Sequence, residues 1–303
     1  MQSEMSTNLS ALWLGERRGY LTDWVTQKWV RLSGRIVNLK EESWLQGHIG
    51  ETAQIGEFYF EKLSQSLRLK LNVNPEGAGL VEDFSVLQST TFSPAKIHPK
   101  IRDFYEHTTK YNLDVWSQWS GIFKPFGWLI ARIFSRRLQQ LNMPISPLET
   151  SRGITSDIIQ LADESDIIVG TGWLRKLVAT SSVIYAGVYS TCKPSKFPAR
   201  CMKVVFALPN GNATVIMKPQ QHPDGSLTLI SSGNGFGEPG FYFIVQKDGG
   251  EAWVKYLHAM KESIHVYVDE TEELRANHVL KLWGATFLKL HYRMRLVSPV
   301  QEI

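Results

Sequence analysis

The chain has 303 residues, of which 43% are hydrophobic and 20% are charged. This composition is that of an ordinary globular protein and not that of a disordered chain. A net charge of +4, from 33 basic and 29 acidic side chains, is too small to indicate a dedicated nucleic-acid surface. We therefore expect a chain that folds without a partner and does not bind nucleic acid.

Residues 1–10 lack the basic stretch, the apolar run and the small-residue cleavage site of a secretory signal. No window reaches the ~20 consecutive apolar residues that a membrane-spanning helix needs. The nearest stretch, 122–134, is interrupted by Lys124 and Arg132. The sequence therefore predicts a cytoplasmic protein that does not cross a bilayer.

Residues 1–152 are predicted to form a mixed, mainly helical region. Within it, Ile55, Phe58, Tyr59 and Leu63 follow helical spacing and precede a turn signal at 74–77. A second amphipathic pattern covers 122–141, with apolar residues on one face and arginines away from it. We expect the segment 98–141 to supply helical cover for a sheet.

Residues 153–303 have the pattern of an antiparallel β-meander. Period-two runs such as Met202, Val204, Phe206 and Leu208 are typical of half-buried strands. Similar runs continue at 227–230, 241–245, 252–258, 264–268 and 286–296. Three hairpin signals between strands supply residues that tolerate positive φ. They are Asn210 with Gly211, Asp224 with Gly225, and Asp248 with Gly249 and Gly250.

A long open sheet exposes its edges, so such a meander must curl or be covered by helices. The predicted fold class is α+β, with a helical N-terminal and central region packed on the C-terminal antiparallel β-meander around a barrel-like or helix-grip cavity. No long flexible linker separates residues 1–152 from 153–303, which predicts one shared core instead of two independent domains.

Residues 104–119 concentrate aromatic, acidic and imidazole side chains. A carboxyl group that faces an aromatic-walled cavity is suited to general acid or base catalysis. The commoner arrangement is a solvated charged face over buried aromatic rings. The candidate catalytic residues are Glu106, His107 and Asp114, and the candidate ligand-binding residues are Tyr105, Trp116 and Trp119.

The sequence contains no motif for a metal, nucleotide or other cofactor. The glycine-rich stretch 232–240 leads into a strand-like run instead of a helix, so we expect a loop and not a phosphate site. Cys192 and Cys201 are too few for a metal site and are expected to be reduced thiols, with a cross-strand disulfide as the alternative. His265 and His291 are expected on a solvated sheet face. We predict no metal and no cofactor.

Three segments in the middle third of the chain, 98–108, 116–119 and 134–141, begin respectively with His98-Pro99-Lys100, Trp116-Ser117-Gln118 and Phe134-Ser135-Arg136. Through them the chain resembles a group of bacterial proteins to which no activity has been assigned. The resemblance implies a bacterial protein and carries over no catalytic residue.

Our first hypothesis is that the chain binds an apolar or polycyclic small molecule, or a lipid-like ligand, in an aromatic-lined cavity. The sequence leaves open whether it also rearranges that ligand as a cofactor-independent cyclase or isomerase, because groups that act only by acid-base chemistry leave no motif. The alternative is a non-enzymatic protein that docks on a membrane or a partner through the basic amphipathic segment 122–141. The oligomeric state is not indicated.

Overall fold

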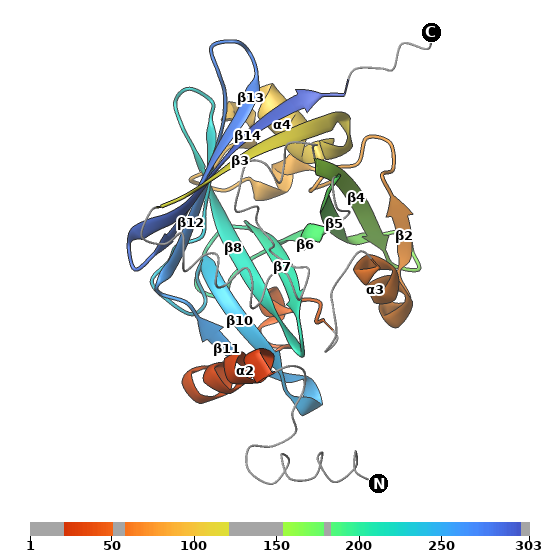
Figure 1. Cartoon of the computed structure of the whole chain (residues 1–303), viewed down its shortest axis with the longest axis vertical. Coiled ribbons are helices and arrows are strands. Elements are labelled where there is room, and N and C mark those ends of the chain that lie inside the picture. The colour runs from red at the N-terminus through yellow and green to blue at the C-terminus, as the bar shows by residue number, and fades with distance from the viewer. Residues whose placement is uncertain (1–20, 51–57, 121–153, 179–182, 298–303) are drawn as a thin grey trace.

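The computed structural model describes residues 21–50, 58–120, 154–178 and 183–297. In these residues antiparallel strands dominate and helices are few (Figure 1). The α-helices are α2 (Leu21–Ser33), α3 (Tyr59–Leu67) and α4 (Pro99–Glu106). The strands are β1 (Arg35–Asn38), β2 (Lys70–Val73), β3 (Tyr111–Trp119), β4 (Ile154–Ala162), β5 (Ile168–Leu177), β6 (Val183–Cys192), β7 (Cys201–Leu208), β8 (Gly211–Gln221), β9 (Leu227–Ile230), β10 (Gly240–Gln246), β11 (Glu251–Tyr256), β12 (Met260–Val268), β13 (Leu274–Leu282) and β14 (Ala285–Leu296).

The described strands belong to one 14-stranded sheet that forks at β8. One edge of β8 pairs with β7, while its other edge pairs with β10 over Gly211–Ile216 and with β9 over Lys218–Gln221. The main path runs β2-β4-β5-β6-β7-β8-β9-β12-β13-β14-β3, and the side branch runs from β10 through β11 to β1. The two arms of the main path lie on different sides of β8. One arm ends in β12, β13, β14 and β3, and the other ends in β5, β4 and β2 (Figure 1).

The sequence predicted a barrel-like sheet, but the described strands form an open, curled sheet. The strand order ends at β2 and β3, and in the part of the chain that the structure describes these two end strands do not pair with each other. The two ends differ in character, because β2 is short and largely exposed whereas β3 is long and buried on one face. The coarser prediction, an antiparallel sheet accompanied by helices, is confirmed, although the described residues hold fewer helices than expected.

The hairpin turns were predicted correctly. Asn210, Gly225, Gly249 and Gly250 all have positive φ, at 56°, 80°, 77° and 80°. Their turns join β7 to β8, β8 to β9, and β10 to β11. These positions were predictable because a two-strand turn is specified by the few residues that form it.

The segment 98–141 was expected to be helical, and this prediction is wrong for the residues of β3. Helix α4 ends at Glu106, and residues Tyr111–Trp119 form β3, which pairs with β14. The side chains of Tyr111, Leu113 and Val115 are buried while those between them are more exposed, which is the period of a strand. The amphipathic pattern at 122–141 lies outside the described residues. Helix α3 confirms the helix predicted around Tyr59 and Leu63, and Ile55 lies outside the described residues.

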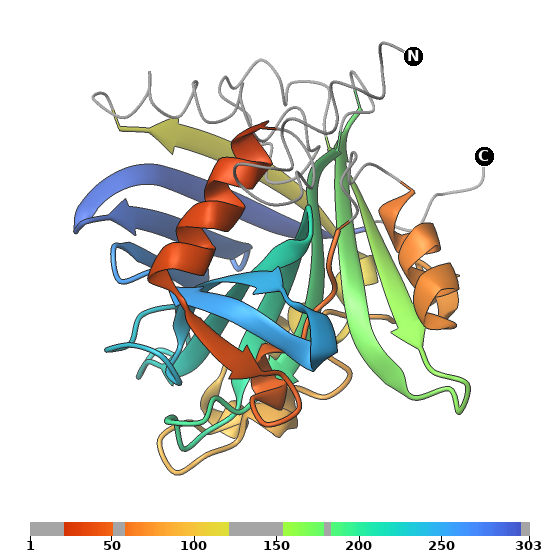
Figure 2. The same cartoon turned by 90° about the horizontal axis from the view of Figure 1, so that it is seen from below.

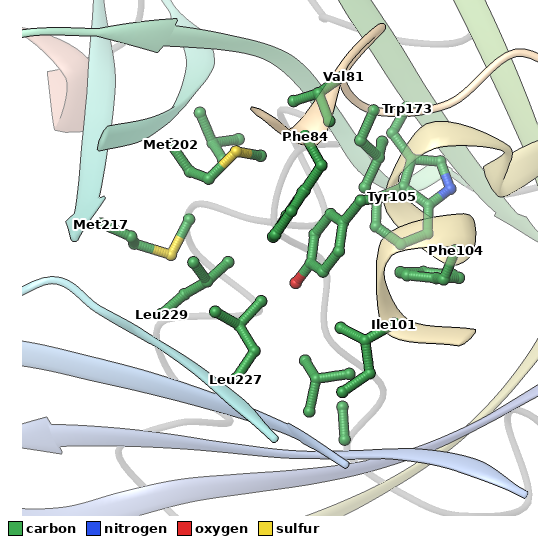
Figure 3. Close-up of a cluster of buried hydrophobic side chains, with 14 of the residues drawn as sticks. Val81, Phe84, Ile101, Phe104, Tyr105, Trp173, Met202, Met217, Leu227 and Leu229 are labelled. Atoms are coloured by element: carbon green, nitrogen blue, oxygen red, sulfur yellow. The ribbon is translucent and has the colours of Figure 1, made fainter. Parts of the chain in front are cut away.

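The main hydrophobic core joins residues from both halves of the chain. Phe84, Phe104 and Tyr105 come from the N-terminal half, and Phe84 lies between Tyr105 and the strand residues Met202 and Met217 (Figure 3). Helix α4 is held in position at its start by Pro99, which suits a first turn, and by His98, whose Nδ1 accepts a hydrogen bond from Lys100 N.

Both cysteines are free thiols, as predicted, and both are buried. Cys192 on β6 lies directly opposite Cys201 on β7 in the strand register. Burial raises the pKa of Cys192 to about 11, with a smaller opposing effect of the Lys203 charge. At neutral pH the Cys192 thiol is therefore protonated and a poor nucleophile.

Gly172 on β5 is predicted to be essential for the packing of α3 on the sheet. A Cβ atom at this position would lie 2.3 Å from Cε1 of Phe60, a ring that is 1% exposed. Gly172→Ala should therefore lower the free energy of unfolding by about 1–3 kcal/mol, because the ring must move in a packed core. Urea denaturation followed by circular dichroism would measure this change.

Gly235→Ala is the matched control, because a Cβ atom there meets its nearest neighbour, Cε1 of His258, at 3.7 Å. Equal stability of the two variants would contradict the packing argument for Gly172.

Candidate functional site: a cavity within the curled sheet

A cavity of about 860 Å³ lies inside the curl of the sheet. Its walls come from β5, β6, β7 and β8 on one side and from β12, β13, β14 and β3 on the other. Strand β10 and helix α2 contribute further residues, and α2 packs across β10 and β11 (Figure 2). Leu80 and two residues of α4, Phe104 and Tyr105, complete the lining. The cavity therefore depends on segments that are far apart in the sequence.

Most of the described lining residues are apolar or aromatic. Trp173 packs edge-on against Tyr185, with ring centroids 5.9 Å apart, and Tyr185 packs edge-on against Phe206 at 5.1 Å. Aliphatic side chains of β8, β9 and β12 also line the cavity, among them Val215, Leu229, Ile264 and Val266. Such walls hold an apolar molecule without leaving its surface in water.

A small set of polar side chains interrupts this apolar lining, and we call it the polar cluster. Its members come from five strands that span the two sides of the cavity. They are Arg175 on β5, Tyr185 and Tyr189 on β6, Glu262 on β12, His278 on β13 and Tyr292 on β14.

Glu262 and His278 form the acidic and imidazole part of the polar cluster. In the β12–β13 pairing Ile264 lies opposite His278, so Glu262 and His278 are diagonal neighbours on the same face. Oε1 of Glu262 contacts Nε2 of His278, and the two side chains are only 9% and 10% exposed. The ring of Tyr292 stacks near the His278 ring at a centroid distance of 6.4 Å.

The tyrosines of the polar cluster are hydrogen-bond donors and acceptors at neutral pH. The hydroxyl oxygens of Tyr185 and Tyr189 lie 2.6 Å apart. Burial raises the pKa of both phenols, and for Tyr185 the neighbouring Tyr189 and the charge of Glu262 raise the pKa further. Burial also raises the pKa of Tyr292. All three phenols therefore keep their protons well above pH 7.

Arg175 supplies the positive charge of the cluster. Its side chain belongs to a residue that is 6% exposed, and its guanidinium lies 5.4 Å from the ring centroid of Trp173 and 5.6 Å from that of Tyr292. Tyr292 also has a hydrogen bond to the guanidinium. The buried Nε and Nη2 atoms of Arg175 have no hydrogen-bond partner among the described residues.

Of the candidate ligand-binding residues, Tyr105 and Trp119 line the cavity and Trp116 does not. Tyr105 is 4% exposed and packs against Phe84, with ring centroids 5.4 Å apart (Figure 3). Trp116 is 45% exposed and its ring lies 6.0 Å from that of His291 on the outer face of the sheet.

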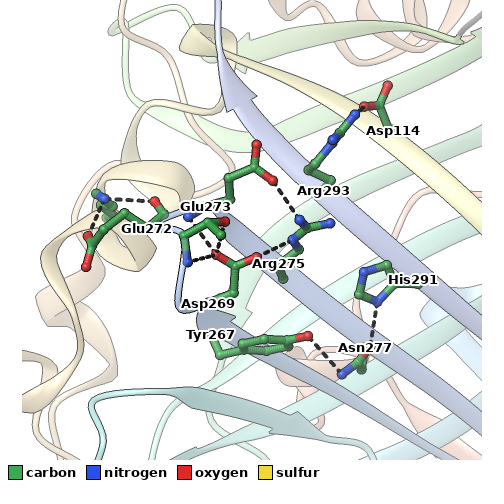
Figure 4. Close-up of polar contacts among 11 residues, drawn as sticks. Asp114, Tyr267, Asp269, Glu272, Glu273, Arg275, Asn277, His291 and Arg293 are labelled. Atoms are coloured by element: carbon green, nitrogen blue, oxygen red, sulfur yellow. Dashed lines mark hydrogen bonds and ion pairs between the residues drawn. The ribbon is translucent and has the colours of Figure 1, made fainter.

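None of the candidate catalytic residues is among the described residues that line the cavity. Glu106 accepts a hydrogen bond from Phe84 N at 2.8 Å, and Nδ1 of His107 lies 2.9 Å from Oδ1 of Asp103. At the outer face Asp114 accepts a hydrogen bond from Arg293 (Figure 4) and another from Arg295. The structure thus places these groups in supporting contacts around α4 and β3, and their catalytic role stays a prediction.

The outer face of β12, β13 and β14 carries the histidines that were expected there. His291 contacts Oδ1 of Asn277 at 2.7 Å, beside an ion-paired group of Asp269, Glu273 and Arg275 (Figure 4). His265 contacts Oγ1 of Thr228 at 3.0 Å. Neither histidine is among the described residues that line the cavity.

The sequence analysis missed His278 because it missed β13. Yet the alternation Leu274, Ala276, His278, Leu280 places this histidine on the apolar face of a strand, and that signal was present. Arg175 carried a weaker signal, because it stands next to Lys176 near the end of a largely apolar strand and nothing local distinguishes the two. In the described part of the chain no three His, Cys, Asp or Glu side chains are grouped closely enough to hold a metal ion.

Comparison with known proteins adds one relative. Over 234 residues the chain is 29% identical to the "Uncharacterized membrane protein YndJ" of Bacillus subtilis (strain 168), an alignment that covers 76% of this chain and 40% of that protein. The chain thus spans well under two thirds of the length of this relative. No protein-family model and no solved structure matches. The predicted resemblance to bacterial proteins without an assigned activity is confirmed.

The prediction of a cytoplasmic protein is not confirmed, because this relative is named as a membrane protein. The helices in the described ranges are too short or too polar for any of them to span a bilayer. The open sheet and the name of this relative therefore both disagree with the predicted description of the chain as a cytoplasmic β-barrel.

Glu106 is predicted to stabilise the fold through its side-chain oxygen, which accepts a hydrogen bond from Phe84 N. Glu106→Ala should lower the free energy of unfolding by about 1–2 kcal/mol, because a backbone N–H next to a fully buried ring loses its partner. Glu106→Gln keeps an acceptor oxygen and should cost much less. Equilibrium unfolding in urea compares the two variants, and a glutamine variant as unstable as the alanine variant would contradict this role.

Proposed function

We propose that this chain binds an apolar or polycyclic small molecule, or a lipid-like ligand, inside the cavity. The observation that carries the proposal is the cavity of about 860 Å³, which is lined mainly by apolar and aromatic side chains. Binding sites for small molecules commonly enclose ~300–1,000 Å³, with a few polar groups among apolar walls. The polar cluster supplies such groups.

The arrangement around the cavity supports this proposal. The curled sheet surrounds the space, α2 lies at β10, and α4 contributes Phe104 and Tyr105. We propose that the sheet and the helices together form a helix-grip-like ligand cavity, as the sequence predicted. Its contents would contact the aromatic rings of Trp173, Tyr185 and Phe206.

An enzymatic form of the proposal assigns acid-base chemistry to the polar cluster. Glu262 and His278 are in contact and mostly buried, which suits transfer of a proton to and from a bound molecule. The tyrosines are protonated and can donate hydrogen bonds to a developing negative charge. We propose a cofactor-independent isomerase or cyclase reaction as the activity to test.

A second candidate function is peripheral contact with a membrane, favoured by the name of the Bacillus relative. The segment 122–141, with its apolar face and its arginines, is the part of the sequence that suits this role. Binding to anionic liposomes that weakens with salt and with charge reversal at Arg132 and Arg136 would support it. Lack of binding to anionic liposomes at low salt would contradict this second function.

Ligand binding is tested by titrating the protein with the neutral apolar fluorophore N-phenyl-1-naphthylamine. The wild-type chain should bind about one equivalent with a rise in fluorescence. Ile264→Trp places a larger ring in the cavity wall and should weaken binding about tenfold or more, because the added volume competes with the probe.

Val73→Trp is the control, since Val73 is 56% exposed on β2 and is not among the described residues that line the cavity. It should bind the probe as the wild type does. A wild-type chain that binds no probe, or an Ile264→Trp variant that is folded and binds normally, would contradict the proposal.

A further inference from the structure

The guanidinium of Arg175 is a buried charge in the lining of the cavity. Arg175 lies on β5, opposite Ser156 of β4 and Tyr185 of β6 in the strand register. It is 6% exposed and faces the cavity. A buried charge is costly unless a counter-charge or several hydrogen bonds offset the loss of water.

Among the residues that the structure describes, no acidic side chain near the cavity provides that counter-charge. Glu262 contacts His278 and forms no ion pair with Arg175 within the described residues. The rings of Trp173 and Tyr292 flank the guanidinium but supply no negative charge. Such ring contacts hold the plane of the group in place.

The two nitrogens left without a partner are Nε and Nη2. Their N–H groups point the same way along one edge of the guanidinium, and that edge matches the two oxygens of a carboxylate or phosphate. The phenols of Tyr185 and Tyr292 are protonated neighbours that can donate to the same anion.

The single positive charge of Arg175 favours a monoanion over a dianion as its partner. Arg175 is the one cationic side chain among the described lining residues, which also include the carboxyl groups of Asp23 and Glu262. A phosphate monoester, with nearly two negative charges at neutral pH, would exceed the positive charge available. A carboxylate matches it.

We propose that the ligand is an amphiphile with an apolar body and one carboxylate, and that Nε and Nη2 of Arg175 bind this carboxylate within the cavity. This inference rests on the proposed ligand-binding function and names the class of ligand. The apolar walls hold the body of the molecule, and the polar cluster fixes which end of it lies at Arg175.

The test is displacement of bound N-phenyl-1-naphthylamine at pH 8 by palmitate, by methyl palmitate and by a lysophosphatidic acid of the same chain length. The wild-type chain should bind palmitate about tenfold or more tightly than the methyl ester, because the ester lacks the charge that pairs with Arg175. Palmitate should also bind more tightly than the phosphate monoester.

Arg175→Gln should remove most of the preference for palmitate over the ester. Arg175→Lys, which keeps the charge but loses the two-nitrogen edge, should retain part of it. Arg293→Gln is the control, because Arg293 pairs with Asp114 on the outer face. Circular dichroism shows whether each variant is folded, and the wild-type comparison stands even where a variant does not fold.

The outcomes separate the two proposals. Tight but equal binding of palmitate and its ester by the wild-type chain would overturn the role of Arg175 and leave the apolar site intact. Stronger binding of the lysophosphatidic acid would overturn the assignment to a carboxylate. Binding of neither the probe nor any of the three amphiphiles would overturn the proposed function itself, and with it this inference.

Discussion

The fork at β8 is the constraint on which the rest of the structure depends. A strand has only two edges, and one edge of β8 is shared between β10 near its start and β9 near its end. Gly211 permits the close approach of β10, because a Cβ atom there would lie 2.0 Å from the carbonyl oxygen of Ile244. Beyond Met217 the pairing with β7 has ended, so Pro219, which has no N–H to donate, is tolerated. The two branches diverge from this point, and their inner faces line the cavity.

Local sequence signals were sufficient for the hairpins and not for the sheet as a whole. Turn residues such as Asn210 and Gly225 determine their own backbone conformation, so the meander could be predicted from short windows. The fork, in contrast, depends on which distant strands compete for one edge of β8, and no short window records that competition. β3 was mistaken for part of a helical region because its buried residues alternate over only a few positions next to a genuine helix, α4.

The candidate site was harder to predict than the fold for a related reason. Its polar residues come from five strands, and no strand contributes more than two of them. Glu106, His107 and Asp114 drew attention because they are close together in the sequence, whereas the side chains that meet in space are Arg175, Glu262 and His278 with their tyrosine neighbours. Proximity along the chain indicated local contacts at the end of α4, as the contact between Nδ1 of His107 and Oδ1 of Asp103 illustrates. His278 alone had a usable signal, in the alternation of β13.

The polar cluster has two parts with different hydrogen-bonding balance. On the β12 and β13 side, the carboxyl group of Glu262 supplies acceptor oxygens beside the ring of His278. On the β5 and β6 side, donors exceed acceptors, because Arg175 can only donate and the phenols of Tyr185 and Tyr189 remain protonated. A bound group that is rich in acceptors would correct this excess, whereas a purely apolar molecule would leave Nε and Nη2 of Arg175 buried without partners. In a weakly polar interior a charge is stabilised chiefly by the few groups that touch it. The apolar walls that favour a lipid-like body therefore also strengthen the interaction between Arg175 and an anionic end of the ligand.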